Sequence, residues 1–251
     1  MNGRAAVSLI LATCLHAQAP IENNGKPMRI PFECTEADSE AGGLNCSDEH
    51  PCPVYLELAN VEAVGDKVFV AGNLHTPDAT LYSILLASDD SGKTWTEPAP
   101  RMRSSGLDQI QFFDFENGWI SGANLQSAPR DPFLLITTDG GKSWRPRPIF
   151  EESRVASIER FWFESRKLGT LLIDARLDNQ RHELYETRTG GESWEMRQSS
   201  ADAVRFPHTF DPAAWRLRAD AATHSNVVEK SLGDRWHAMA SFLVDEGACK
   251  Q

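Results

Sequence analysis

The sequence contains no apolar stretch long enough to cross a membrane, and it is poor in basic residues. Its longest apolar run, residues 5–15, has 11 residues, whereas a transmembrane helix needs about 20. Its 251 residues include 36 acidic and 25 basic ones, a formal net charge of −11. A negatively charged chain repels phosphate backbones. We therefore expect no transmembrane segment and no nucleic-acid partner.

The common signatures of catalysis and cofactor binding are also missing. No glycine-rich phosphate loop follows a strand, and there is neither a serine nucleophile elbow nor a zinc-binding helix motif. The histidines are scattered without the spacing of metal ligands, and the chain has only 3 tyrosines. We therefore assign no catalytic residue, no metal and no cofactor from the sequence.

The first 19 residues are typical of a secretion signal. One arginine precedes the apolar run, and Ala17-Gln18-Ala19 has the small-x-small form of a cleavage site. Residues 11–14 resemble a lipoprotein box, but Thr13 is larger than the residue that usually precedes the lipidated cysteine, which argues against lipid anchoring at Cys14. The protein is expected to be exported, either to a periplasm or to the medium.

Four cysteines follow the signal: Cys34, Cys46, Cys52 and Cys249. An even number in an exported chain favours disulfide bonds, with three connectivities open. Cys46, His50 and Cys52 could alternatively hold a metal, but their spacing matches no established zinc pattern. We interpret residues 20–53, which show no apolar period, as an irregular segment held by disulfides.

A repeated pattern, Ser/Thr-x-Asp-x-Gly-x-Ser/Thr-Trp, occurs at residues 88–95, 137–144 and 187–194, the third copy having Thr189 in place of the aspartate. The tryptophans are 49 and 50 residues apart, and an eroded fourth copy with the same glycine-to-tryptophan spacing follows after 42. A period of this length decides the architecture. The pattern residues are Ser88, Asp90, Gly92, Thr94, Trp95, Thr137, Asp139, Gly141, Ser143, Trp144, Thr187, Gly191, Ser193, Trp194, Gly233 and Trp236.

Strand-like segments precede each copy of the pattern. Residues 54–59 alternate apolar and polar side chains, and residues 66–72 and 81–87 lead into the first copy. Because no stretch shows sustained helical periodicity, we predict an all-β protein. Strand, hairpin, strand, turn and strand at this period indicate a β-propeller of about four four-stranded blades over residues 54–245, followed by a tail at 246–251.

The repeats resemble the Asp-boxes, or BNR repeats, of the sialidase-like propeller superfamily. Residues 111–122 and 135–144 are most similar to repeats of the photosystem II assembly factor family, and the resemblance covers about residues 54–240. In that superfamily the box lies on the outer rim, so the resemblance implies a structural role for the pattern residues. It implies little about function, because the fold hosts unrelated activities.

The families that the chain resembles have six or more blades, and four are found here. We expect a closed four-bladed ring formed by one chain; the alternative is an arc completed by another chain. Since the two ends of a closed propeller lie side by side, we hypothesise that Cys249 pairs with Cys34, Cys46 or Cys52 and clasps the ring.

Two functions remain open from the sequence. A sialidase-like hydrolase of carboxylated sugars would use Arg29, in Arg-Ile-Pro, to grip a carboxylate, but it also needs two further arginines and a Tyr–Glu nucleophile pair. Tyr185 beside Glu183 fits ordinary strand alternation better. We favour a non-enzymatic module that binds a protein or glycan, or scaffolds an assembly, through loop aromatics such as Trp162 or Trp215.

Overall fold

The structure, a computed structural model, describes residues 19–126, 128–176, 179, 181–208, 214–244 and 248–249. Cys14 and all of the expected signal sequence except its last residue lie outside the described residues, as does most of the expected tail. Within the described part, α1 (Glu36–Gly42) is the single helix. No helix there is long and apolar enough to cross a membrane.

Four sheets of consecutive antiparallel strands form the body of the protein. The first contains β4 (Tyr55–Val64), β5 (Lys67–His75) and β6 (Thr80–Ser88). The second contains β8 (Ser105–Phe112), β9 (Gly118–Leu125), β10 (Pro129–Thr137) and β11 (Arg145–Pro148). The third contains β12 (Ser157–Phe163), β13 (Gly169–Asp174), β14 (His182–Thr187) and β15 (Glu195–Ser200). The fourth contains β16 (Trp215–Asp220), β17 (Ser225–Leu232) and β18 (Arg235–Val244). The all-β prediction of propeller blades is confirmed.

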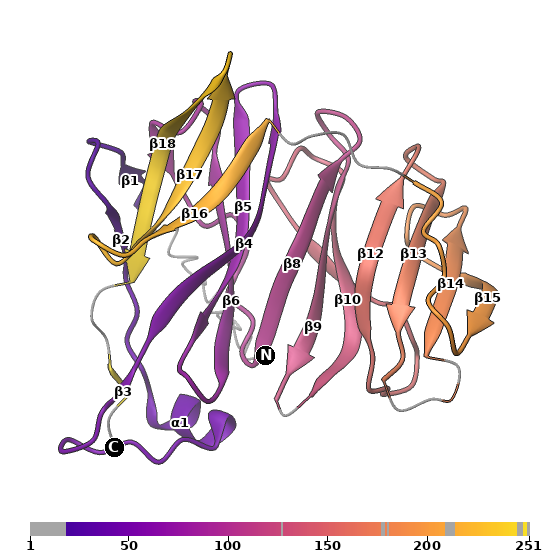
Figure 1. The fold of residues 1–251 in the computed structure, drawn as a ribbon, viewed down its shortest axis with the longest axis horizontal. Helices are drawn as coiled ribbons and strands as arrows, with labels where there is room; N and C mark the ends of the chain where they lie inside the picture. The colour runs from indigo at the N-terminus through magenta and orange to yellow at the C-terminus, as the bar shows by residue number, and fades with distance from the viewer. Residues whose placement is uncertain are drawn as a thin grey trace, which may run out of the picture.

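The sheets stand in an open row, with the fourth beside the first, then the second and the third (Figure 1). The first strands of the sheets, β16, β4, β8 and β12, are neighbours along the row, and we call them the inner strands. Within the described residues, no strand of the third sheet packs closely on the fourth, and the two sheets lie at opposite ends of the molecule (Figure 1). The expected closed ring is therefore wrong for this part of the chain.

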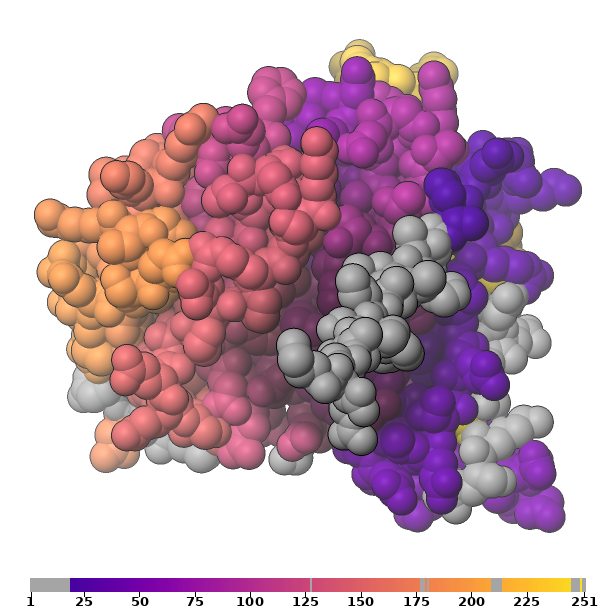
Figure 2. Space-filling model, turned by 180° about the vertical axis from the view of Figure 1, so that it is seen from behind, coloured from indigo at the N-terminus to yellow at the C-terminus, as the bar shows by residue number. Residues whose placement is uncertain are grey.

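The segment at 20–53 is more regular than the sequence suggested. Its β1 (Ile21–Glu22) pairs with β7 (Thr94–Trp95), which lies beside the first sheet, and its β2 (Met28–Ile30) is a parallel outer strand on β18. Its β3 (Cys52–Pro53) pairs with β19 (Ala248–Cys249). The N-terminal segment thus holds the first and fourth sheets together, at the far end from the third sheet (Figure 2).

Two disulfides hold this end of the molecule. Cys34 bonds to Cys249 across a separation of 215 residues, and Cys46 bonds to Cys52 across 6. The predicted clasp is confirmed, although it joins the chain ends without closing a ring. The pairing of Cys46 with Cys52 also excludes the alternative in which their thiolates hold a metal.

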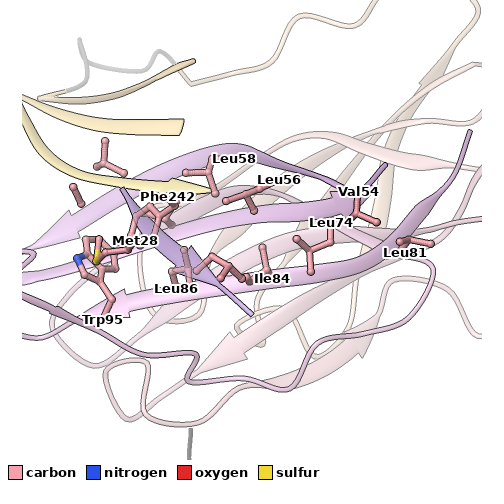
Figure 3. Packing of buried hydrophobic residues seen from close by; sticks show 14 of the residues in the cluster. Met28, Val54, Leu56, Leu58, Leu74, Leu81, Ile84, Leu86, Trp95 and Phe242 are labelled. Carbon is pink, nitrogen blue, oxygen red and sulfur yellow. The ribbon is translucent and has the colours of Figure 1, made fainter. Parts of the chain in front are cut away.

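Large aromatic side chains fill the junctions between sheets. Trp95 meets Phe242 edge-on at 5.0 Å between the first and fourth sheets, beside Met28 (Figure 3). Trp119 stacks on Phe163 at 3.7 Å between the second and third sheets. Because Trp95 and Trp119 are at most 1% exposed, each contributes a large buried apolar area to its junction. Trp95, the tryptophan of the first repeat, therefore fills the junction between the first and fourth sheets.

Candidate functional site

The inner strands carry a β-bulge at the same place in three of the four sheets. The register shifts between Leu58 and Asn60 in β4, and between Leu107 and Ile110 in β8. In β12 the shift follows Ile158, whereas β16 pairs with β17 without a shift. A bulge adds a residue to one strand and re-aims its side chain. The added residues are Ala59 in β4 and Glu159 in β12, and in β8 the two residues Asp108 and Gln109 face the single residue Ser121.

Glycines on the second strands make room for the first two bulges. A Cβ on Gly72 would lie 2.3 Å from the backbone oxygen of Glu57. A Cβ on Gly122 would lie 2.7 Å from the backbone oxygen of Gly106. No side chain fits at such distances, so the final glycine of the repeated Phe-Val-Ala-Gly and Trp-Ile-Ser-Gly sequences is explained by close backbone approach.

Polar side chains fix the backbone on both sides of Asp108. The Leu107 N–H donates to Asn73 Oδ1 at 2.9 Å, so the first sheet holds one side of the bulge. The Gln109 N–H donates to Ser121 Oγ at 3.0 Å on the other side. Since Asn73 and Ser121 are themselves buried, the position of Asp108 is set by the fold rather than by a mobile loop.

The bulges open into a hollow that we call the acidic trough, formed by two adjoining cavities of about 320 Å³ each. The two cavities share Glu57, Leu125 and Pro129. The first extends over β4, β8 and the beginning of β12, and the second extends to the loop between β5 and β6. The charged residues of the trough are Glu57, Asp78, Asp108 and Arg176.

Negative charge dominates this trough. Burial raises the pKa of Asp108, and repulsion by the Glu57 carboxylate raises it further, although Asp108 keeps access to solvent. Arg176 lies 3.5 Å from Asp174, so its charge is partly compensated outside the trough. Within the described residues, no hydrogen-bond donor or cation pairs with the carboxylates of Glu57 or Asp108. The site can therefore accept a cationic group.

Two other hollows are less suited to a ligand. One of them, of about 480 Å³, lies beside α1. There Tyr82 donates to Asp38 at 2.6 Å, and Arg103 pairs with Asp38 at 3.0 Å, so the polar atoms already bond to one another. A hollow of about 240 Å³ lies over the fourth sheet, where Arg218 is already paired with Glu229 at 3.1 Å.

The sequence pattern residues form three turns that we call the repeat hairpins, residues 88–95, 137–144 and 187–194. In the second, Asp139 accepts the Ser143 N–H at 3.0 Å and its hydroxyl at 2.6 Å. The Ser143 hydroxyl and then other donors lower the pKa of Asp139 to about 2. Asp90 has the same role in the first hairpin, where the Thr94 N–H is the main cause of a pKa of about 2. These bonds stabilise the turns.

The third hairpin keeps this geometry with a weaker acceptor. The Ser193 N–H donates to the Thr189 hydroxyl at 3.0 Å, but a hydroxyl lacks the second oxygen of a carboxylate. In the first two hairpins the tryptophan Nε1 donates to the glycine carbonyl, at 3.0 and 3.1 Å. Trp194 Nε1 is buried with no such partner within the described residues.

The eroded fourth copy is not equivalent to the other three. The repeat hairpins follow the third strand of a sheet, whereas Gly233 lies in the turn between β17 and β18, the second and third strands of the fourth sheet. Gly233 and Trp236 thus belong to a plain hairpin between two neighbouring strands. Trp236 is 37% exposed and lies under the Arg216 guanidinium at 4.3 Å, so it does not fill a junction between sheets.

The repeat hairpins lie at the opposite end of the strands from the acidic trough. In β10, Pro129 at one end lines the trough, and Thr137 at the other begins the second hairpin. Arg29 is also distant, because β2 is the outermost strand of the fourth sheet and Arg29 is exposed on it. Arg29 therefore does not line the trough and cannot hold a carboxylate bound there.

The Tyr185 and Glu183 pair is a buried structural cluster. The Tyr185 hydroxyl donates to Glu183 at 2.9 Å, and Arg154 pairs with Glu183 at 2.7 Å. Burial is the main cause that raises the pKa of Tyr185 to about 12, which is unsuitable for a nucleophile. Tyr185 packs among the apolar residues between the second and third sheets. Sequence alternation indicated a strand here but gave no sign of Arg154.

The two tryptophans considered for ligand binding have partners within the chain. Trp162 in β12 lies against His208, which is in the segment that follows β15, and their ring centroids are 6.0 Å apart. Trp215 is partly buried against the core of the first and fourth sheets, and the Lys230 ammonium lies 5.1 Å from its ring. Neither tryptophan lines the acidic trough.

No family model matches the chain. Over 117 residues it is 28% identical to an oligoxyloglucan-reducing end-specific xyloglucanase of Emericella nidulans, covering 45% of this chain and 14% of that protein. Among solved structures, it is similar to YCF48 bound to D1 peptide, with a TM-score of 0.43 and 17% identity over 75% of this chain and 54% of that one. It is also similar to a GH74 xyloglucanase from Xanthomonas campestris, with a TM-score of 0.40 and 16% identity over 75% of this chain and 29% of that one. The chain thus spans little more than half of these proteins at most.

Proposed function

We propose that the chain is an exported, non-enzymatic propeller protein that binds a partner, or scaffolds an assembly, through the acidic trough. The observation that carries this proposal is the preorganised bulge at Asp108, which is held by Asn73 and Ser121 and faces an open cavity of about 320 Å³. Concave sites with a few fixed polar groups are where proteins commonly bind ligands. The two disulfides support export, because such bonds persist in oxidising compartments.

Under this proposal the repeat hairpins are Asp-boxes of the BNR type, and their role is structural. Their aspartates accept hydrogen bonds from residues of the same turn, as Asp139 does from Ser143. Their position at the far end of the strands from the trough supports the same division of roles.

A variant that fills the trough without changing charge tests the proposal. Ala59 lines the cavity and is exposed, so Ala59→Trp blocks the site while leaving the core unchanged. Ala222→Trp, in the exposed turn between β16 and β17, is the matched control. The full chain and both variants would be used to capture partners from an extract of the source organism. A partner retained by the wild type and by Ala222→Trp, and lost with Ala59→Trp, is expected; equal retention by all three would refute the proposal.

A glycoside hydrolase is the second candidate, favoured by one observation. Asp108 has a raised pKa beside the Glu57 carboxylate, and glycosidases pair a protonated acid with an ionised carboxylate. Carboxylated sugars are disfavoured as substrates because a sialidase-like site needs several arginines. Among the described residues that line the trough, Arg176 is the single arginine. Sugar release from a panel of sialosides and uronides, abolished by Asp108→Asn and retained by Glu116→Gln, would favour the hydrolase over the binding protein.

A further inference from the structure

The shape of the acidic trough suits an extended chain. Its two cavities meet at Glu57, and together they run from Ile158 at the start of the third sheet to Asp78 in the loop after β5. A hollow that crosses three sheets and stays open to solvent is longer than a single side chain requires. A peptide in extended conformation follows such a path with its side chains alternating toward the floor.

The charge of the trough selects a cation. Glu57, Asp78 and Asp108 line it, and Arg176 is drawn toward Asp174 at 3.5 Å. Glu57 and Asp108 come from neighbouring sheets and line the same cavity; burial, and then repulsion by Glu57, raises the pKa of Asp108. A lysine or arginine head group between them would relieve that repulsion and form charge-assisted hydrogen bonds.

The apolar lining of the trough does not suit a sugar. None of its described lining residues is phenylalanine, tyrosine or tryptophan, and the apolar surface comes from small or aliphatic residues such as Ala59, Leu125 and Pro129. Aromatic rings supply the large flat contact area that a sugar ring would need. The lining favours a polypeptide.

We infer that the acidic trough binds an extended segment of a partner protein, with at least one lysine or arginine side chain of that segment held between Glu57 and Asp108. This inference rests on the proposed function and specifies the chemistry of the partner. The contacts of Asn73 and Ser121 hold the backbone that carries Asp108, and Glu57 lies on the paired strand β4, so little ordering of the backbone is needed on binding.

The test uses the full chain and a fluorescein-labelled dodecapeptide of alternating serine and lysine, with two matched peptides in which glutamine or glutamate replaces lysine. Anisotropy titrations should show the lysine peptide binding at least about tenfold more tightly than either matched peptide, with an affinity that falls as salt is raised. Equal binding of the three peptides, or no binding of the lysine peptide at about millimolar concentration, would contradict the inference.

Two double variants separate the trough from general surface charge. The double variant Glu57→Gln with Asp108→Asn should lower the affinity for the lysine peptide at least about tenfold. Asp89→Asn with Glu116→Gln removes the same charge from exposed residues at the hairpin end and should change the affinity less than about twofold. Equal loss in both would show that binding is non-specific. Spermidine binding as tightly as the peptide would assign the trough to small cations instead.

The outcomes also distinguish this inference from the proposed function. If Ala59→Trp abolishes partner capture while the glutamine and lysine peptides bind alike, the trough is a binding site with another chemistry. If Ala59→Trp leaves capture intact, the proposed function itself is wrong.

Discussion

The disulfide between Cys34 and Cys249 should stabilise the protein much more than the one between Cys46 and Cys52. The first closes a loop of 215 residues and the second a loop of 6. Each pair contains one buried and one partly buried cysteine, so the loss of side-chain packing is comparable. Replacing each pair by two alanines therefore compares two loop lengths within one protein, and alanine avoids placing a hydroxyl in the buried positions.

The expected magnitudes follow from chain entropy. A cross-link restricts the unfolded chain by an amount that grows with the logarithm of loop length, which gives about 5 kcal/mol for the long loop and about 2 kcal/mol for the short one. The native state adds to the difference. The residues beside Cys249 form β19, which pairs with β3, and the N-terminal segment also supplies β2 to the fourth sheet. Loss of the long link frees both ends of the chain.

Urea unfolding at equilibrium measures the effect, followed by tryptophan fluorescence and by circular dichroism. The Cys34→Ala/Cys249→Ala variant should lose at least about 2 kcal/mol more than the Cys46→Ala/Cys52→Ala variant. Coincident transitions with the two probes are needed before a free energy is assigned. If the long-loop variant is no less stable than the short-loop variant, the argument from loop length is wrong for this protein.

Three further predictions follow from single residues. Trp119→Ala should cost about 3–5 kcal/mol in urea unfolding because it removes the buried stack on Phe163, whereas the exposed Trp236→Ala should cost less than about 1 kcal/mol. Thr189→Asp should stabilise the third repeat hairpin by about 1 kcal/mol at neutral pH. That gain should be lost as pH falls from about 4 toward about 2, since the equivalent carboxyls have pKa values of about 2. Burial raises the pKa of Glu62 from its ordinary 4.5 to about 7, so the fold should lose stability as pH rises from about 4.5 to about 7. Glu62→Gln should therefore raise the unfolding midpoint at pH 8 and leave it unchanged at pH 4.

The strands and hairpins of the first three sheets could be predicted because each rests on a local signal. The alternation of apolar and polar residues at 54–59 predicted the first half of β4. The glycine of each repeat pattern predicted a turn with positive φ, as Gly141 has at 82°. The same reasoning gave a wrong prediction for the fourth sheet. Gly233 also has a positive φ, of 65°, and a glycine followed three residues later by tryptophan arises in a plain two-strand hairpin as readily as in a repeat pattern.

The acidic trough could not be predicted, because a bulge leaves almost no trace in the sequence. One added residue breaks alternation at Asp108 just as a loop residue would, and the partners that reveal the bulge, Asn73 and Ser121, are distant in sequence or on another strand. The contribution of residues 28–30 to the fourth sheet was missed for a similar reason, since three residues show no period. Long-range pairing rather than local propensity forms both features.

The open row of sheets has a physical basis in the residues at its two ends. The first two sheets each present an aromatic side chain to the next sheet, Phe69 and Trp119 respectively. Both pair with the residue just before a repeat hairpin, and the residue of β13 that does so is Thr170. At the other end, the outward face of the fourth sheet carries Glu229, paired with Arg216 at 2.6 Å and Arg218 at 3.1 Å. Burying that ionic cluster under a further blade would cost desolvation of its charges. Within the described residues, one end of the row thus has a threonine where the first two sheets have an aromatic ring, and the other end has an ionic cluster.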